Sequence, residues 1–227
     1  MSLIFYAIYA FLYLGLLWWG GLSLRSAATN LQRSAALALL LILGGLFYDN
    51  LILALGNLLG EGDLLFYLSL PRFVLHQLLL PWLIWVVYVL LRARGHGWAA
   101  SSRARTGALL LSLIVVVLGV ATRLVGLELA PTVLDGVVRY AAVGTVGPPL
   151  VSIVSVGLAG VAGLLIWRRS GWPWLFVTVA LAFLAEALPS PALKRLLGSG
   201  AEVALMISLL FLLGRVQFAS GSLADVR

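Results

Sequence analysis

The chain has 227 residues, of which 63% are hydrophobic and 10% charged, and it contains no cysteine. Soluble domains carry charge on about a quarter of their residues, so this composition excludes the soluble globular class. The absence of cysteine excludes disulfides, thiolate metal sites and a cysteine nucleophile. The net charge of +7 does not indicate a nucleic-acid partner, because the basic residues stand in short connections between apolar segments.

Seven apolar segments fill the chain, and crossing a bilayer as a helix takes about 20 such residues. We therefore predict an all-α fold, a polytopic transmembrane helical bundle that forms a single integral-membrane domain over residues 1–227. The predicted spans are residues 3–24, 35–59, 68–91, 107–127, 145–167, 172–189 and 201–219.

Residues 128–144 interrupt this pattern with Pro131, Asp135 and Arg139. We predict a short surface helix there, in which Asp135 and Arg139 form a salt bridge because residues four apart share a helix face. An eighth span is the alternative.

Charge is distributed unevenly between the two sets of connections. One set, with the C-terminal tail, has ten basic residues and one acid, Asp225, whereas the other has five basic and seven acidic residues. The positive-inside rule then predicts the N-terminus outside and the C-terminus inside. We expect a multi-pass protein of a bacterial plasma (inner) membrane. The ten basic residues are Arg25, Arg33, Arg92, Arg94, Arg103, Arg105, Arg168, Arg169, Arg215 and Arg227.

Small residues recur every four positions in the fifth span, at Ser155, Ala159 and Gly163. This spacing lets helix backbones approach closely. Packing within the bundle is the favoured interpretation, and a seam between copies in a homo-oligomer or membrane complex is the alternative.

Asp49 lies well inside the second predicted span, and Arg72 and His76 lie four residues apart in the third. Charged groups inside a membrane are costly and face the bundle interior. We predict that Asp49 contacts Arg72 or His76 between antiparallel neighbouring helices. The pair either fixes helix register or belongs to a proton relay or headgroup site.

Further polar and aromatic residues extend this candidate site. Asn50 and Asn57 are seven residues apart on one helix face, and Trp82 lies deep enough to line a pocket. With Arg72 they form the predicted ligand-binding set.

Glu186 ends the sixth predicted span and Glu202 opens the seventh, on the same side of the membrane as Asp49. They are either rim acids neutralised by Lys194 and Arg195 or carboxyls that face one outward-opening cavity. In the second case burial would give the two carboxyls different pKa values.

Three functions fit these residues. The first is an enzyme acting on a lipid or isoprenoid by acid–base chemistry, with Asp49, His76, Glu186 and Glu202 as catalytic candidates. The second is a non-catalytic lipid- or pigment-binding subunit of a membrane complex, and the third, less favoured, is a small-solute transporter. The expected partners are membrane lipids and an amphiphilic small molecule.

No residue pattern identifies a cofactor. Lys194 is the only lysine and lies in a connection, which argues against a retinal Schiff base within the last helix. Two histidines, one of them in a loop, cannot build a histidine-rich zinc site inside the membrane, so no metal is predicted.

Overall fold

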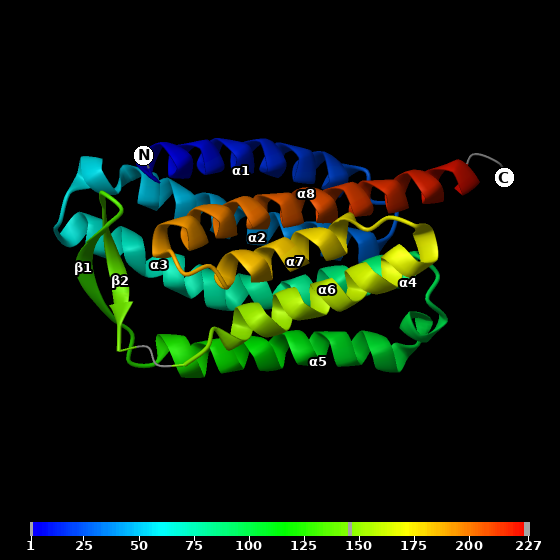
Figure 1. The fold of residues 1–227 in the computed structure, drawn as a ribbon. Coiled ribbons are helices and arrows are strands. Elements are labelled where there is room, and N and C mark those ends of the chain that lie inside the picture. Colours follow the sequence, from blue (N-terminus) through cyan, green and yellow to red (C-terminus); the bar gives the residue numbers. More distant parts are fainter. Residues whose placement is uncertain (1, 145–146, 225–227) are drawn as a thin grey trace.

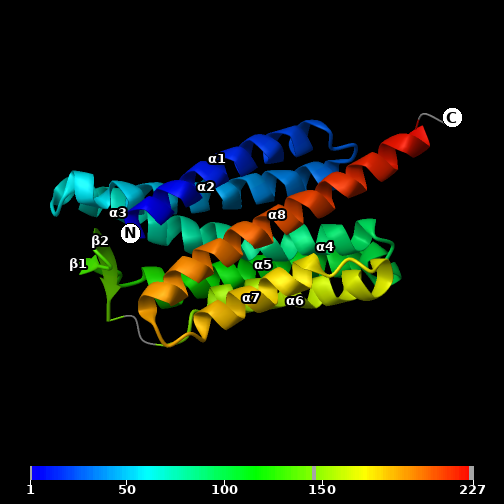
Figure 2. The same cartoon turned by 45° about the horizontal axis from the view of Figure 1, so that its top comes forward.

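The computed structural model describes residues 2–144 and 147–224. Its helices lie side by side along one direction, and a β-hairpin stands across one end of them (Figure 1). Helix α1 begins at the hairpin end, and α8 ends at the opposite end (Figure 2). The α-helices are α1 (Ser2–Arg25), α2 (Asn30–Leu59), α3 (Asp63–Leu79), α4 (Leu83–Ala93), α5 (Ser102–Gly119), α6 (Leu150–Ser170), α7 (Trp174–Glu186) and α8 (Pro191–Ala224).

Shorter elements join or end these helices. Two are single helical turns, one is a π-helical turn that ends α5, and two strands form the hairpin. They are η1 (Leu80–Trp82), η2 (Gly97–Ala100), η3 (Val120–Leu124), β1 (Glu128–Leu134) and β2 (Val137–Val143).

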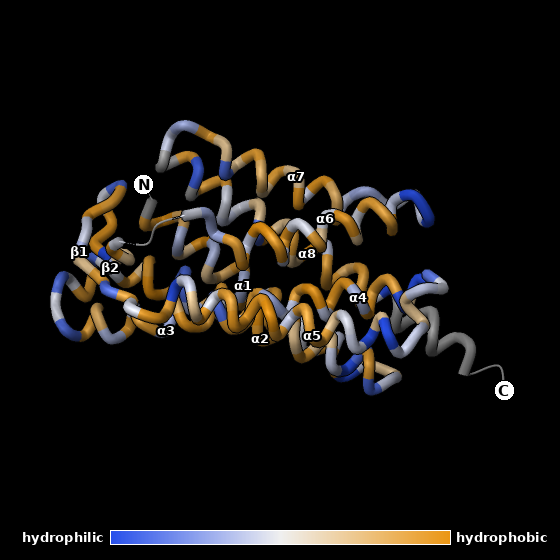
Figure 3. The backbone as a smooth tube through the Cα atoms, turned by 90° about the horizontal axis from the view of Figure 1, so that it is seen from below, coloured by the Kyte–Doolittle hydropathy of each residue, from blue (hydrophilic) through white to orange (hydrophobic). Residues whose placement is uncertain are grey.

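Six helical segments of the described chain are long and apolar enough to cross a membrane, and α7 is shorter, with 13 residues. Hydrophobic residues occupy the middle of the helices, and hydrophilic residues gather at the two ends of the bundle (Figure 3). The predicted all-α multi-pass bundle is therefore confirmed, and six of the seven predicted spans fall on these segments. The predicted span 172–189 falls on the shorter α7, and residues 145 and 146, where the predicted span 145–167 begins, lie outside the described residues. The six segments are Leu3–Arg25, Asn30–Leu59, Asp63–Ala93, Ser102–Leu124, Leu150–Ser170 and Leu196–Arg215.

Helix α4 forms the centre of the core. All of its residues from Leu83 to Leu91 are buried. A helix that is hydrophobic on every side is stable only when other helices surround it, and α2, α5, α6 and α8 all contact α4. The η1 turn joins α3 to α4 around Pro81, which has no N–H to donate within a regular helix.

The small-residue stripe of the fifth span packs inside the bundle. Ser155, Ala159 and Gly163 are buried on α6. A Cβ on Gly163 would lie 2.6 Å from the backbone nitrogen of Phe176 on α7. The stripe thus brings α6 and α7 into close contact, which confirms packing within one chain.

Residues 128–144 form neither a surface helix nor an eighth span, and both predictions are wrong. Asp135 and Gly136 have φ angles of 55° and 78°, and they form the turn of a hairpin whose register pairs Thr132 with Arg139. Asp-Gly with both φ angles positive is the preferred two-residue hairpin turn. The predicted Asp135–Arg139 salt bridge is wrong as well, since Asp135 lies in the turn and Arg139 in β2.

The hairpin is docked onto the end of α2. The Asn57 amide donates from Nδ2 to the carbonyl of Gly136 at 2.7 Å, and its Oδ1 accepts from the N–H of Val138 at 2.7 Å. The preceding residue, Gly56, is buried against β2, where a Cβ would lie 2.0 Å from the Val138 carbonyl oxygen. The hairpin therefore depends on an asparagine and a glycine of α2.

We expect Gly56→Ala to lower the stability of the protein, because the new methyl group would push the hairpin off α2. Overpacking of this kind costs about 1–3 kcal/mol. The measurement is the thermal unfolding midpoint in detergent, together with hydrogen exchange of the β2 amides.

The matched control is Gly44→Ala on the same helix, where a Cβ would meet no atom within 4 Å. Alanine is a better helix former than glycine by up to about 1 kcal/mol, so this variant should be unchanged or more stable. Equal midpoints and equal exchange in the two variants would show that the hairpin does not rest on Gly56.

Candidate functional site

Asp49 and Arg72 join α2 to α3 by an ion pair. The Nε atom of Arg72 donates to Oδ1 of Asp49 at 2.8 Å. The Arg72 side chain is 9% exposed and the Asp49 side chain 37% exposed, so the guanidinium is the more deeply enclosed partner. The predicted contact between these helices is present, and Arg72 is the partner that makes it.

His76 lies one helical turn beyond Arg72, so both side chains lie on the same side of α3. Its Nε2 atom is 3.2 Å from the hydroxyl oxygen of Ser152 on α6. A small hollow of about 20 Å³, bordered by Asp49, Arg72 and His76, separates the histidine from the ion pair. This hollow has room for about one water molecule.

The carboxyls of α7 and α8 differ in their partners. Glu186 accepts from the Nζ atom of Lys194 through Oε2 at 2.7 Å, and both side chains are largely exposed. Glu202 has no ion pair among the side chains that the structure describes. It is therefore the carboxyl that stays available to a bound molecule.

One cavity of about 340 Å³ brings these groups together at the hairpin end of the bundle. It is bordered by all four catalytic candidates, Asp49, His76, Glu186 and Glu202, and by Arg72. Small-molecule pockets span about 300–1,000 Å³, so the size suits a ligand headgroup. The lining is balanced in charge, since these three acids face three cations, Arg72, Arg139 and Lys194.

A second hollow adjoins the cavity on its other side. His76 and Gln77 border both spaces, and Ser152 and Arg123 border the second hollow, which holds about 180 Å³. His76 thus lies between the two spaces. Among the described residues, no cluster of three or more His, Asp or Glu side chains could hold a metal ion.

Three residues of the predicted ligand-binding set lie away from this cavity. Asn50 is buried and donates from Nδ2 to the Leu46 carbonyl of its own helix at 2.9 Å. Asn57 binds the hairpin, and Trp82 lines a separate groove nearer the opposite end of the bundle. The structure places only Arg72 of that set with the charged candidates.

The sequence analysis did not assign four of the cavity residues to the site. They are Tyr6, Gln77, Arg139 and Ser199. Gln77 follows His76 directly, and its polarity inside a span was an available signal. Arg139 reaches the cavity because its strand turns back over the helices, which a helical assignment cannot predict. Tyr6 and Ser199 are brought in by the packing of α1 and α8.

No protein-family model matches the chain, and neither the curated proteins nor the solved structures contain a significant match to it. The residues and their geometry therefore carry the functional inference.

We expect Asp49→Ala to destabilise the protein more than the double variant Asp49→Ala/Arg72→Ala. The single change leaves the enclosed Arg72 charge without its partner, and because Asp49 is partly exposed the cost should fall below the roughly 3–5 kcal/mol of a fully buried pair. Chemical unfolding in detergent measures the three free energies. A double variant whose loss of stability equals the sum of the two single losses would contradict a coupled pair.

The exposed pair provides the comparison within the same cavity. Removing Glu186, Lys194 or both should change stability by less than about 1 kcal/mol, because solvent screens an exposed pair.

Proposed function

We propose that this protein is a membrane-embedded enzyme that acts on an amphiphile, a lipid or an isoprenoid, by acid–base chemistry in the cavity at the hairpin end. The observation that carries the proposal is the meeting of Asp49, His76, Glu186 and Glu202 around one cavity from four different helices. Ionisable groups within a membrane protein are costly, and helix packing alone does not require four of them around one cavity.

Each cavity group has a distinct role in this proposal. Glu202 lacks an ion-pair partner within the described side chains and is the proton donor or acceptor. His76, held by Ser152, is the second proton carrier. Such a pair suits a reaction in which one substrate atom gains a proton and another loses one.

The ion pairs supply position and charge. Asp49 and Arg72 form a fixed pair of charges beside His76 that orients a polar headgroup. Glu186 and Lys194 border the cavity at its more exposed part, where a headgroup would enter. Apolar residues such as Leu46, Leu53 and Phe73 line the remaining wall and suit the start of an apolar chain.

The test compares lipid and isoprenoid extracts of membranes that contain the wild-type protein, Glu202→Gln or His76→Ala. Removal of a general acid or base slows a reaction about 10²–10⁴-fold. Mass spectrometry should therefore show a product in the wild-type extract that falls to background in both variants. Glu128→Gln, an exposed change on β1 outside the cavity, should match the wild type.

Two outcomes would contradict the enzyme. Identical extracts from all four proteins would remove the catalytic role. A bound amphiphile that co-purifies unchanged with the wild type and is lost from Glu202→Gln would instead support the non-catalytic lipid- or pigment-binding subunit.

A further inference from the structure

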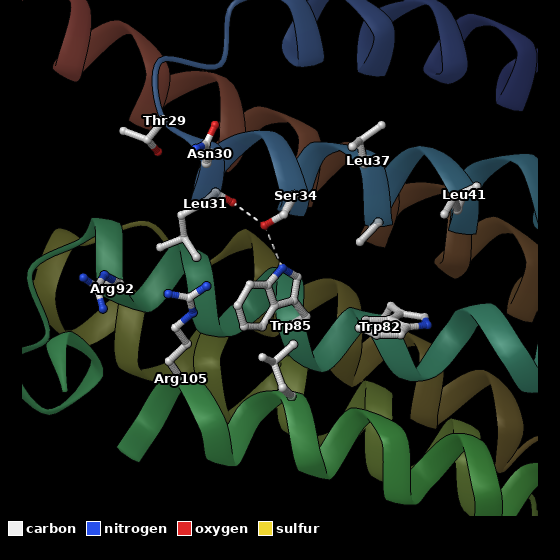
Figure 4. A pocket seen from close by; sticks show the side chains of 12 residues that line it. Thr29, Asn30, Leu31, Ser34, Leu37, Leu41, Trp82, Trp85, Arg92 and Arg105 are labelled. Carbon is white, nitrogen blue, oxygen red and sulfur yellow. Dashed lines mark hydrogen bonds between the residues drawn. The ribbon is translucent and has the colours of Figure 1, made fainter. Parts of the chain in front are cut away.

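A second and larger space lies in the other half of the bundle, toward the end that holds most of the arginines. It is a groove of about 770 Å³ between α2, α4 and α5. Figure 4 shows α2 and α5 on either side of it, with α4 between them and Trp82 and Trp85 along its length. None of its lining residues borders the polar cavity, so the two sites are separate.

The interior of the groove is largely apolar, and the polar atoms of Trp85 and Ser34 already have partners within the protein. The indole Nε1 of Trp85 donates to the Ser34 hydroxyl oxygen at 3.0 Å, and that hydroxyl donates to the Leu31 carbonyl at 2.8 Å (Figure 4). The walls beside them are Leu37, Leu41 and other hydrophobic side chains. These walls suit a hydrocarbon chain.

The groove is open to its surroundings and has the length of one leaflet. Leu37 and Leu41 are 46% and 58% exposed, on a helix that lies in the membrane. From Asn30 to Leu41 the helix rises roughly 16 Å at 1.5 Å per residue, about half of the hydrocarbon thickness. An acyl chain of one leaflet would therefore lie along it from end to end.

Two arginines stand at the mouth of the groove, Arg92 on α4 and Arg105 on α5 (Figure 4). Arg92 is held in place by donation from Nη1 to the Ala100 carbonyl at 3.0 Å. The ion pairs of the described residues, Asp49–Arg72 and Glu186–Lys194, lie in the other half of the protein. No described acid neutralises the two guanidinium groups, so the groove mouth attracts an anion from outside the chain.

We propose that this groove binds one acyl chain of an anionic phospholipid from the leaflet at the arginine-rich end, with the phosphate against Arg92 and Arg105. The site is independent of the proposed acid–base cavity. A zwitterionic lipid would fill the same apolar walls, but the cation of its headgroup offsets the charge of its phosphate, so the groove selects for a net negative headgroup.

The test uses the purified, delipidated full chain and native mass spectrometry. Phosphatidylglycerol and phosphatidylcholine with identical acyl chains are added back in competition, and the bound lipids are counted. Wild-type protein should retain phosphatidylglycerol in preference. Arg105→Gln should weaken that binding about five-fold, since one basic residue near an anionic headgroup contributes about that factor.

Arg103→Gln is the matched control, because Arg103 is an exposed arginine two residues earlier on α5 that does not border the groove. Its lipid binding should match the wild type. The Arg105 side chain makes no described hydrogen bond or ion pair, so we expect its replacement to leave the fold intact. Equal loss in both arginine variants, equal retention of the two lipids, or displacement of phosphatidylglycerol by inorganic phosphate alone would overturn the site.

Discussion

A charge inside a membrane span must be paired, and the Asp49–Arg72 contact is where this protein meets that constraint. The pair fixes α2 against α3, which are joined by a connection of only three residues, 60–62. With that register set, His76 lies one turn deeper on α3 and reaches Ser152 of α6. On α2, Asn57 lies two turns from Asp49 toward the membrane surface, where it holds the hairpin turn. The ion pair thus helps to position both His76, inside the bundle, and the hairpin at the membrane surface.

The helices could be predicted because hydrophobic length alone determines where a span lies. The contact of Asp49 with α3 followed from the cost of an unpaired charge and from the short connection between the two helices. The burial of Ser155, Ala159 and Gly163 followed from their spacing. In each case a local pattern has one physically acceptable solution.

The hairpin and the groove depend on information that such patterns do not contain. Asp135 and Arg139 are four residues apart, which fits a helix, but Asp135-Gly136 between two hydrophobic residues forms a turn and places Arg139 at the cavity instead. That dipeptide was the signal for the hairpin, and it was outweighed by the helical character of the rest of the chain. Trp82 borders the groove and not the polar cavity, because only the packing of α2 and α5 around α4 decides which space it lines.

The two ends of the bundle have different chemistry. The hairpin end holds a charge-balanced cavity with one carboxyl, Glu202, free of an ion pair among the described side chains. The opposite half holds a lipid-sized apolar groove whose arginines lack acidic partners within the described residues. We infer that the first of these sites opens to the side of the membrane opposite the arginine-rich loops.

Cysteine accessibility tests this claim most directly, because the chain has no cysteine of its own. Ser199 borders the cavity, and Ser170 is exposed at the opposite end of the bundle. In intact cells, a membrane-impermeant maleimide should modify Ser199→Cys and should modify Ser170→Cys only after permeabilisation. Modification of Ser170→Cys in intact cells, with Ser199→Cys protected until permeabilisation, would contradict an outward-opening site.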